Sequence, residues 1–349
     1  MPLFEPSRPN HMQKCGVLLV NLGTPDSPQP RDVYRYLNEF LTDGRVIDIP
    51  WLWRQFLVRG LIVPLRYRTS AKAYAQIWSS HNGSPLLIHG KSAQKLLQAS
   101  LGSSYQVELA MRYQNPSIEQ ALRRLHEADC QRLIILPLFP QYASATTGSV
   151  HQRVMEVLKK WPVIPPLHFV SSFPTQPSMI QSFSAIAGTY NLAAYDHILF
   201  SFHGLPQRHI AKADRHNQCL KTPNCCQTLC SKNSMCYKAQ CHATAQAIAQ
   251  TLPLSTAQFS ICFQSRLGKD PWLQPYTSHT IEELAKQGKK KILVFCPSFV
   301  CDCLETLYEI GIEYQHEFQR LGGIQLDLAH GLNDHPLWIQ SLTEMVKAK

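Results

Sequence analysis

The chain has 349 residues and a formal net charge of +10, which is enough length for two domains of ordinary size. The basic residues are scattered, with one tight run at Lys289–Lys291, so the composition argues against a nucleic-acid-binding arm. No apolar run reaches the roughly eighteen residues of a membrane span, and the N-terminus lacks the basic start and apolar core of a signal peptide. We therefore expect a cytoplasmic protein whose positive charge suits an acidic partner.

The N-terminal part begins with a predicted disordered lead at residues 1–14, followed by a short buried strand. Val17–Val20 form this strand, which runs into a Gly-Thr-Pro turn. Apolar residues keep helical spacing from Val33 to Leu41. Residues 51–63 then interleave Trp, Leu and Phe with arginines, and two interpretations stay open. The segment is either a buried helix pair or an exposed apolar lip that rests on a membrane or admits a flat hydrophobic ligand.

A strand–helix–strand pattern follows and occurs twice. Its members are a strand at 105–113, a helix at 115–129 and a strand at 131–142, and later a strand at 257–266, a helix at 278–288 and a strand at 290–299. Each half also opens with a strand and a turn, LLVNLGTP at 18–25 and ILFSFHGLP at 198–206. The pattern predicts an α/β fold of two similar Rossmann-like halves, each a parallel sheet flanked by helices, with a cleft between them.

The expected organisation follows from this repeat. We place the N-terminal half at residues 15–172 and the C-terminal half at 173–325, with a cysteine-rich insert at 215–241. Residues 326–349 end in an amphipathic helix that is expected to pack back on the N-terminal half.

His203 stands at the end of the predicted strand 198–202, directly before a turn containing Gly204 and Pro206. The carboxyl ends of parallel strands are where open α/β sheets bind ligands. A single histidine at such a position is commonly satisfied by a backbone carbonyl, so its role depends on what lies opposite.

A row of glutamates supplies that context. Four of them recur at a spacing of four residues on one predicted helix: Glu305, Glu309, Glu313 and Glu317. No lysine or arginine is interleaved to offset the like charges, so the row is either a solvated face or a site relieved by a cation or shared proton. Because the helix follows strand 290–299, Glu305 is expected near the cleft that His203 faces. An imidazole opposite carboxylates suits a divalent metal or proton removal.

Cysteine usage is the third unusual feature. Six of the twelve cysteines fall in one short polar segment: Cys219, Cys225, Cys226, Cys230, Cys236 and Cys241. Thiols in the cytosol favour zinc or iron–sulfur ligation over disulfides. The spacing lacks the paired CxxC knuckles of zinc ribbons, and a cysteine-rich module that binds nucleic acid would leave the histidine and glutamate motifs unexplained.

The motifs together resemble the ferrochelatase family over nearly the whole chain, from Gly16 to about Val346. The matching blocks are LVNLGTP, YAQIWSSHNGSPLL, AMRYQNP, PQYASATTGS, FSFHGLP, QSRLGKDPWLQPY and CLETLYEIGIEY. The resemblance implies a lyase that inserts Fe²⁺ into protoporphyrin IX, forming protohaem with release of two protons at the terminal step of haem biosynthesis. Porphyrin and ferrous iron are then the substrates. We also expect the protein to associate peripherally with the inner membrane. No nucleic-acid partner is expected, and the oligomeric state stays open.

The resemblance also assigns roles to residues. It makes His203 and Glu305 the catalytic pair that also meets the iron, and it places Glu309 and Glu313 on a π-helical metal or proton path. The porphyrin-wall positions are Leu22, Arg112, Tyr142, Trp272 and Phe299, with Arg112 facing the propionates. Trp272 has loop packing as its alternative.

The chain departs from the family pattern at two places. Cys303 stands where many members carry histidine, and Ser144 occupies a ligand position of the vertebrate-type cluster, whose C-terminal ligand extension is also absent. The insert instead resembles that of certain bacterial ferrochelatases with a [2Fe–2S] centre, which implies Cys219, Cys226, Cys236 and Cys241 as ligands, with zinc as the alternative.

Two alternative enzymatic activities remain open. A ferrochelatase acting on coproporphyrin III is one, although Leu22 in place of the tyrosine of that branch favours protoporphyrin. A cobalt chelatase of the same superfamily is the other, although the FVCDCLE segment lacks the second metal-binding histidine usual there.

Overall fold

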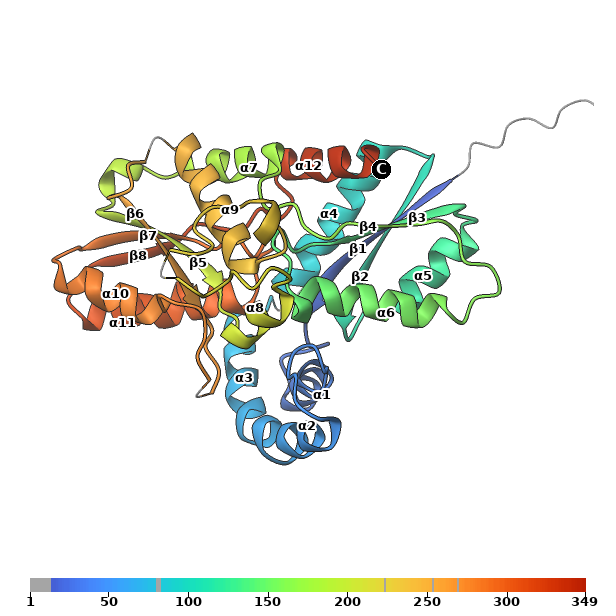
Figure 1. Ribbon diagram of the computed structural model, residues 1–349, viewed down its shortest axis with the longest axis horizontal. Coiled ribbons are helices and arrows are strands. Elements are labelled where there is room, and N and C mark those ends of the chain that lie inside the picture. The colour runs from blue at the N-terminus through green and yellow to red at the C-terminus, as the bar shows by residue number, and fades with distance from the viewer. Residues whose placement is uncertain (1–13, 80–82, 223, 253, 269) are drawn as a thin grey trace, which may run out of the picture.

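The structure is a computed structural model that describes residues 14–79, 83–222, 224–252, 254–268 and 270–349. The predicted disordered lead, apart from Lys14, lies outside the described residues. Two parallel sheets of four strands each stand next to one another, with helices around them (Figure 1). This arrangement confirms the predicted fold class.

The two sheets have the same strand order. The first contains β1 (Cys15–Gly23), β2 (Tyr105–Tyr113), β3 (Arg132–Pro137) and β4 (Leu167–Phe169), in the order β2-β1-β3-β4. The second contains β5 (His197–His203), β6 (Phe259–Gln264), β7 (Lys291–Phe295) and β8 (Gln325–Leu328), in the order β6-β5-β7-β8. The central strands are apolar and buried on both faces, as expected for parallel strands covered by helices.

Helices cover both sheets and join the halves. The first sheet packs against α4 (Pro85–Leu101), α5 (Ile118–Glu127) and α6 (Ser149–Leu158). The second contacts α9 (Tyr237–Thr251), α10 (Thr277–Lys286) and α11 (Gln315–Arg320). The last helix, α12 (Pro336–Lys347), packs against α4 and against α7 (Pro177–Ala187), and its Trp338 is fully buried in a core that includes strands of both sheets.

Three predicted strands end earlier than expected, β6 at Gln264 and two others at or near a proline. β3 stops at Pro137 and β7 stops at Phe295, just before Pro297, because proline has no N–H to continue a ladder. The residues after each strand are loops instead, and several of them line the cavity described below.

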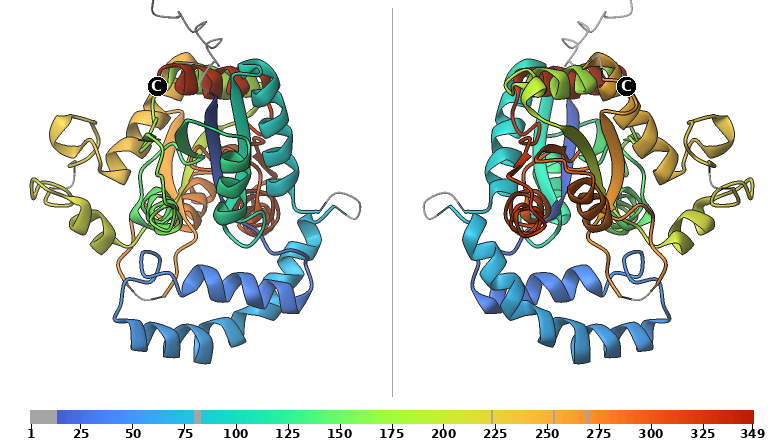
Figure 2. Two further views of the ribbon diagram at one scale, coloured as in Figure 1. Left: turned by 90° about the vertical axis from the view of Figure 1, so that its right-hand side faces the viewer. Right: turned by 90° about the vertical axis from the view of Figure 1, so that its left-hand side faces the viewer.

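Residues 30–77 form a separate layer of helices at one end of the molecule. This layer consists of α1 (Pro30–Leu41), α2 (Trp51–Leu57), the π-helical turn η1 (Val58–Ile62) and α3 (Val63–Ile77), and it projects beyond both sheets (Figures 1 and 2). Trp51, Leu52 and Phe56 on α2 are 62%, 72% and 72% exposed. The segment 51–63 is therefore an exposed apolar lip rather than a buried helix pair. Among the described residues, no helix has the length and apolar character needed to cross a bilayer.

The glutamate-bearing helix is a π-helix over most of its length. It is η5 (Leu304–Tyr314), which continues as α11. Its i→i+5 hydrogen bonds leave the glutamates at a spacing close to one turn, so that they stay on one side of the helix.

Candidate active site

A cavity of about 920 Å³ lies between the two halves and the 30–77 layer. It collects residues from the carboxyl ends of the strands in both sheets, as the topology requires. Seven of the predicted site residues line it: Leu22, His203, Trp272, Phe299, Glu305, Glu309 and Glu313.

His203 is the last residue of β5, and its hydrogen bonds define its tautomer. Nδ1 lies 2.6 Å from the carbonyl oxygen of Gly204. A carbonyl oxygen can only accept, so Nδ1 carries the proton and Nε2 of the neutral ring keeps its lone pair. Within the described part of the chain Nε2 makes no hydrogen bond, which leaves it available for a proton or a metal ion.

Two aromatic rings flank this imidazole. The ring centroids of Trp272 and Phe299 lie 6.3 Å and 6.1 Å from that of His203. Gly204 allows this close packing, because a Cβ there would lie 2.8 Å from the carbonyl oxygen of Gln264 and 3.1 Å from the Trp272 ring. The HGLP motif therefore requires glycine at position 204, because a Cβ atom would clash with these two neighbours.

The glutamates of η5 lead from this imidazole toward solvent. Glu305 and Glu309 are half-buried and Glu313 is exposed. Partial desolvation of its carboxyl group by the surrounding protein still raises the pKa of Glu313, and the neighbouring Glu317 raises it further. The three carboxylates therefore form a row with an inner and an outer end, and both ends line the cavity.

Glu309 is held firmly by the loop after β6. Its carboxylate accepts hydrogen bonds from the Ser265 backbone N–H at 2.9 Å and from the Ser265 hydroxyl at 2.5 Å. Gln264 donates to the same carboxylate at 3.1 Å and to the backbone carbonyl of Glu305 at 2.8 Å. Burial nevertheless raises the pKa of Glu309, against these hydrogen bonds. The group is thus fixed in place and brought closer to the pH range in which it can exchange a proton.

Arg112 and Tyr142, both predicted to contact porphyrin, lie outside the lining of the cavity. Arg112 is on the edge strand β2, where its guanidinium donates to Asp43 at 2.6 Å and to the Ser149 hydroxyl at 2.7 Å. Its charge is therefore already matched by a carboxylate. The Tyr142 backbone N–H donates to the Gln240 side chain at 2.7 Å.

Three arginines that were not predicted as site residues line the cavity instead: Arg66, Arg208 and Arg266. Arg66 comes from α3 and Arg266 from the loop after β6, and both side chains are exposed. Neither has an ion-pair partner among the described residues, and Arg266 stacks on the Tyr276 ring at 4.9 Å. The QSR sequence at the end of a strand was a signal for Arg266, while Arg66 lies in an arginine-rich stretch with nothing to distinguish it.

Asp48 joins the N-terminal loop to the C-terminal half beside the cavity. Its carboxylate accepts from Arg208 Nε at 2.7 Å, lies 3.2 Å from His209 Nε2, and pairs with Lys212. Arg208 also pairs with Asp270 on the loop after β6. Burial alone would raise the pKa of Asp48, but the hydrogen bonds from Lys212 and Arg208 outweigh it and hold the pKa far below its usual range.

Three of the four predicted cluster ligands meet in the insert. The thiols of Cys219, Cys226 and Cys236 are buried and lie within 4.8 Å of one another, with 3.4 Å between the last two. Cys241, the fourth predicted ligand, is not in this group, although its thiol is also buried. Cys225 does contact the group, since its Sγ lies 3.7 Å from that of Cys226. The same Sγ accepts a hydrogen bond from the Leu220 backbone N–H, with 2.7 Å between the nitrogen and the sulfur.

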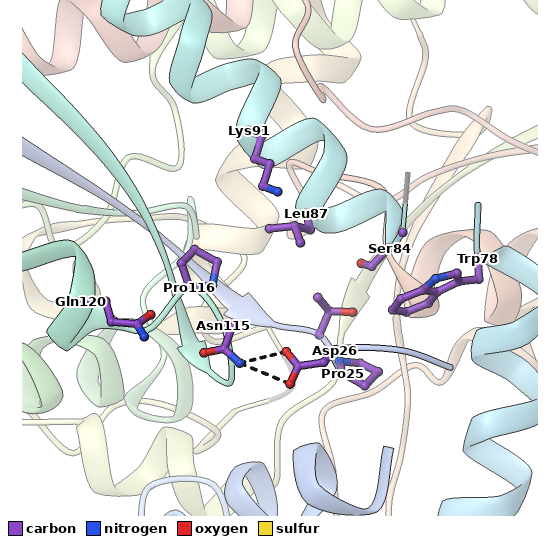
Figure 3. A pocket seen from close by; sticks show the side chains of 11 residues that line it. Pro25, Asp26, Trp78, Ser84, Leu87, Lys91, Asn115, Pro116 and Gln120 are labelled. Carbon is purple, nitrogen blue, oxygen red and sulfur yellow. Dashed lines mark hydrogen bonds between the residues drawn. The ribbon is translucent and has the colours of Figure 1, made fainter. Parts of the chain in front are cut away.

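A smaller pocket of about 440 Å³ adjoins the main cavity and shares Thr24 and Ser84 with it. Lys91 projects into it from α4, and Asn115 donates to Asp26 at 3.0 Å on its opposite side (Figure 3). None of the residues predicted as site residues lines this pocket.

Comparison with known proteins agrees with this geometry. The family model described as Ferrochelatase matches residues 14–349. A ferrochelatase of Legionella pneumophila (strain Paris) is 46% identical over 331 residues, which cover 95% of this chain and 98% of that protein. A ferrochelatase of Coxiella burnetii (strain Dugway 5J108-111) is 45% identical over 337 residues, or 96% of this chain and 93% of that protein.

Solved structures agree at the level of the fold. SirB from Bacillus subtilis, determined with Fe³⁺, superimposes with a TM-score of 0.53 at 11% identity, covering 96% of this chain and 94% of that one. The sirohydrochlorin chelatase SirB from Bacillus subtilis subspecies spizizenii with cobalt gives the same TM-score at 9% identity.

Proposed function

The chain belongs to the ferrochelatase family, and we propose that it inserts ferrous iron into protoporphyrin IX to form protohaem, with release of two protons. The reaction makes it a lyase, a protoporphyrin ferro-lyase, at the terminal step of haem biosynthesis. The observation that carries the proposal is one cavity lined by His203, whose Nε2 makes no hydrogen bond among the described residues, by a row of carboxylates and by flat apolar side chains.

The residues divide the chemistry between them. Iron can enter the ring only when two pyrrole N–H protons have left, and a neutral imidazole is a suitable base for this at neutral pH. Glu305, Glu309 and Glu313 then pass protons outward or strip water from the incoming Fe²⁺, because carboxylates serve both purposes. The raised pKa of Glu309 favours the first of these roles.

Charge at the cavity wall supports a porphyrin with carboxylate substituents. Arg66 and Arg266 lack ion-pair partners among the described residues and can meet the propionates, while Leu22, Trp272 and Phe299 supply apolar wall. Arg112 can bind a propionate only if its guanidinium releases the Asp43 carboxylate. The apolar Leu22 favours protoporphyrin over the more acidic coproporphyrin.

An assay of Fe²⁺ insertion tests the proposal. Purified protein is given Fe²⁺ anaerobically with protoporphyrin IX or coproporphyrin III, and product formation is followed by absorbance. We expect the higher kcat/KM with protoporphyrin IX. A preference for coproporphyrin III would change the substrate, and no insertion into either porphyrin would refute the function.

For the insert we propose a [2Fe–2S] cluster held by Cys219, Cys226, Cys236 and a fourth thiol. The convergence of three buried thiols within 4.8 Å of one another supports a metal site, because thiolates at such distances can bind the same metal centre. The family resemblance favours Cys241 as the fourth ligand, whereas the short Sγ–Sγ distance and the amide N–H bond favour Cys225.

Metal analysis separates these possibilities. Anaerobically purified protein should contain about two irons and two sulfides per chain, and its visible absorption should bleach with dithionite. One zinc and no colour would replace the cluster with a zinc site. Serine variants of Cys225 and Cys241 then identify the fourth ligand, since only one of them should lower the metal content.

We also propose that the protein works in the cytoplasm with its apolar lip against the inner membrane. The lip combines exposed apolar side chains with exposed arginines, including Arg59 and Arg66, which suit an anionic membrane surface. Its position beside the cavity would let a hydrophobic porphyrin pass between bilayer and site.

A further inference from the structure

Tyr237 connects the thiol group of the insert to the imidazole of the active site. It is the first residue of α9, directly after Cys236, and it is buried while also lining the cavity. Its hydroxyl donates a hydrogen bond of 2.8 Å to the backbone carbonyl of His203.

The backbone around His203 is held from both sides. The His203 N–H donates to the Ser298 hydroxyl at 3.1 Å, and the carbonyl on the other side accepts from Tyr237. The next carbonyl, that of Gly204, accepts from Nδ1 of the imidazole. The peptide that joins His203 to Gly204 is thus held by its carbonyl at Tyr237 and by its N–H at the Gln264 carbonyl, 2.8 Å away. A shift of this peptide would move Gly204, whose carbonyl orients the ring.

The other end of the connection is fixed at the thiol group. Cys236 is the N-cap residue of α9, and its Sγ lies 3.4 Å from that of Cys226. Cys226 has a φ of 66°, an uncommon conformation for a residue with a side chain, in the turn that directs its thiol toward Cys236. A metal bound by these thiols would therefore fix the position of the first turn of α9, and with it that of Tyr237.

We propose that Tyr237 is a positioning residue that couples metal occupancy of the thiol group to the orientation of His203. The inference rests on the proposed function, because it assigns the insert a role in iron insertion. With the metal bound, the Tyr237 hydroxyl holds the peptide after His203 in the orientation that presents Nε2 to the porphyrin. With the metal lost, the turn containing Cys236 relaxes and that hydrogen bond weakens.

A two-by-two comparison tests the coupling. Wild-type protein and Tyr237→Phe are each assayed as purified with their metal and after removal of it by a chelator. We expect metal removal to weaken the binding of an N-methylated porphyrin to the wild type by 5- to 150-fold, the usual range of coupling between two sites, and to lower its kcat as well. Tyr237→Phe should retain its metal, but its kcat should already be as low as that of the metal-free wild type. Removal of the metal from this variant should lower its kcat little further.

Tyr190→Phe is the matched control. Tyr190 also donates its hydroxyl to a backbone carbonyl in the same half, that of Leu328 at 3.3 Å, but it does not line the cavity. It should behave as the wild type does. Cys226→Ser empties the thiol group without altering Tyr237. It should lower kcat and weaken porphyrin binding, as metal removal does in the wild type.

A second readout needs no turnover. Coupling is reciprocal, so a bound porphyrin should slow the release of the thiol-site metal to a chromogenic chelator. With an N-methylated porphyrin as the probe, we expect slower release in wild type and Tyr190→Phe and no slowing in Tyr237→Phe. Equal slowing in all three, or a metal-free Cys226→Ser protein with wild-type kcat, would overturn the coupling. Absence of iron insertion by the wild type would instead refute the proposed function, while the release rates could still be read.

Discussion

His203 and Glu309 show how single side chains in this cavity acquire their properties from neighbouring strands. The Gly204 carbonyl sets the tautomer of His203, and Ser265 and Gln264 fix Glu309. The sequence indicated His203 because a strand end followed by a Gly/Pro turn is a local signal. It could not separate Arg112 from Arg66, because whether an arginine is paired depends on a partner such as Asp43, 69 positions away from Arg112.

The glutamates should differ in their effect on turnover. We expect Glu305→Gln to cripple iron insertion, by an amount on the order of the 10²–10⁴-fold attributed to a proton-transfer group, and Glu309→Gln to weaken it less. Steady-state kcat with saturating protoporphyrin IX measures both. Glu317→Gln is the control, because Glu317 belongs to the same row but does not line the cavity. An equal loss in Glu317→Gln would show that the row acts as a structural face.

Among the elements, the lip and η5 illustrate what sequence patterns can and cannot predict. Apolar side chains in residues 51–63 indicated helices but left burial open, because exposure depends on whether another element covers them. The structure leaves α2 uncovered among the described residues, with Trp53 69% exposed. The glutamate spacing indicated one face of a helix, which is correct, while the π-helical form came from the family resemblance and not from the spacing.

The lip should bind anionic membranes without spanning them. In liposome flotation at low salt, we expect the wild type to float with anionic vesicles, because its exposed apolar side chains enter the interface and nearby arginines meet the headgroups. Replacing Trp51 and Phe56 by serine should abolish flotation while iron insertion into detergent-solubilised porphyrin continues. Wild-type protein that stays at the bottom of the gradient with anionic vesicles would assign the lip to substrate entry alone.

For the whole molecule, the repeated strand order was the most predictable feature. Alternating strand and helix patterns indicated two parallel sheets, and the right-handed crossover rule left few other topologies. The contacts between the halves were not predictable, since they join residues distant in sequence. Asp48 is the clearest example, because it links the loop after α1 to Arg208 and Lys212 on α8 (Gln207–Ala213).

Asp48 should make stability depend on acid pH. Its folded-state pKa lies below the unfolded value of about 3.9, so the stability that it contributes is complete above that value and is lost as the pH falls through the folded pKa. We expect Asp48→Asn to be less stable than wild type in urea at pH 7, with the difference narrowing below pH ~4. Asp26→Asn, which removes an exposed ion pair with Arg35, should stay within about 0.5 kcal/mol of wild type. A pH-independent difference for Asp48→Asn would contradict the ion-pair account.

The most direct test of the account is the turnover of His203→Ala. Iron insertion is measured at saturating Fe²⁺ and protoporphyrin IX, alongside porphyrin binding and the circular dichroism spectrum, with His197→Ala at the opposite end of β5 as the control. We expect His203→Ala to keep its fold and bind porphyrin while kcat falls on the order of 10²–10⁴-fold, because it lacks the imidazole base that lines the cavity. A folded His203→Ala protein with more than about a tenth of wild-type turnover would contradict that role.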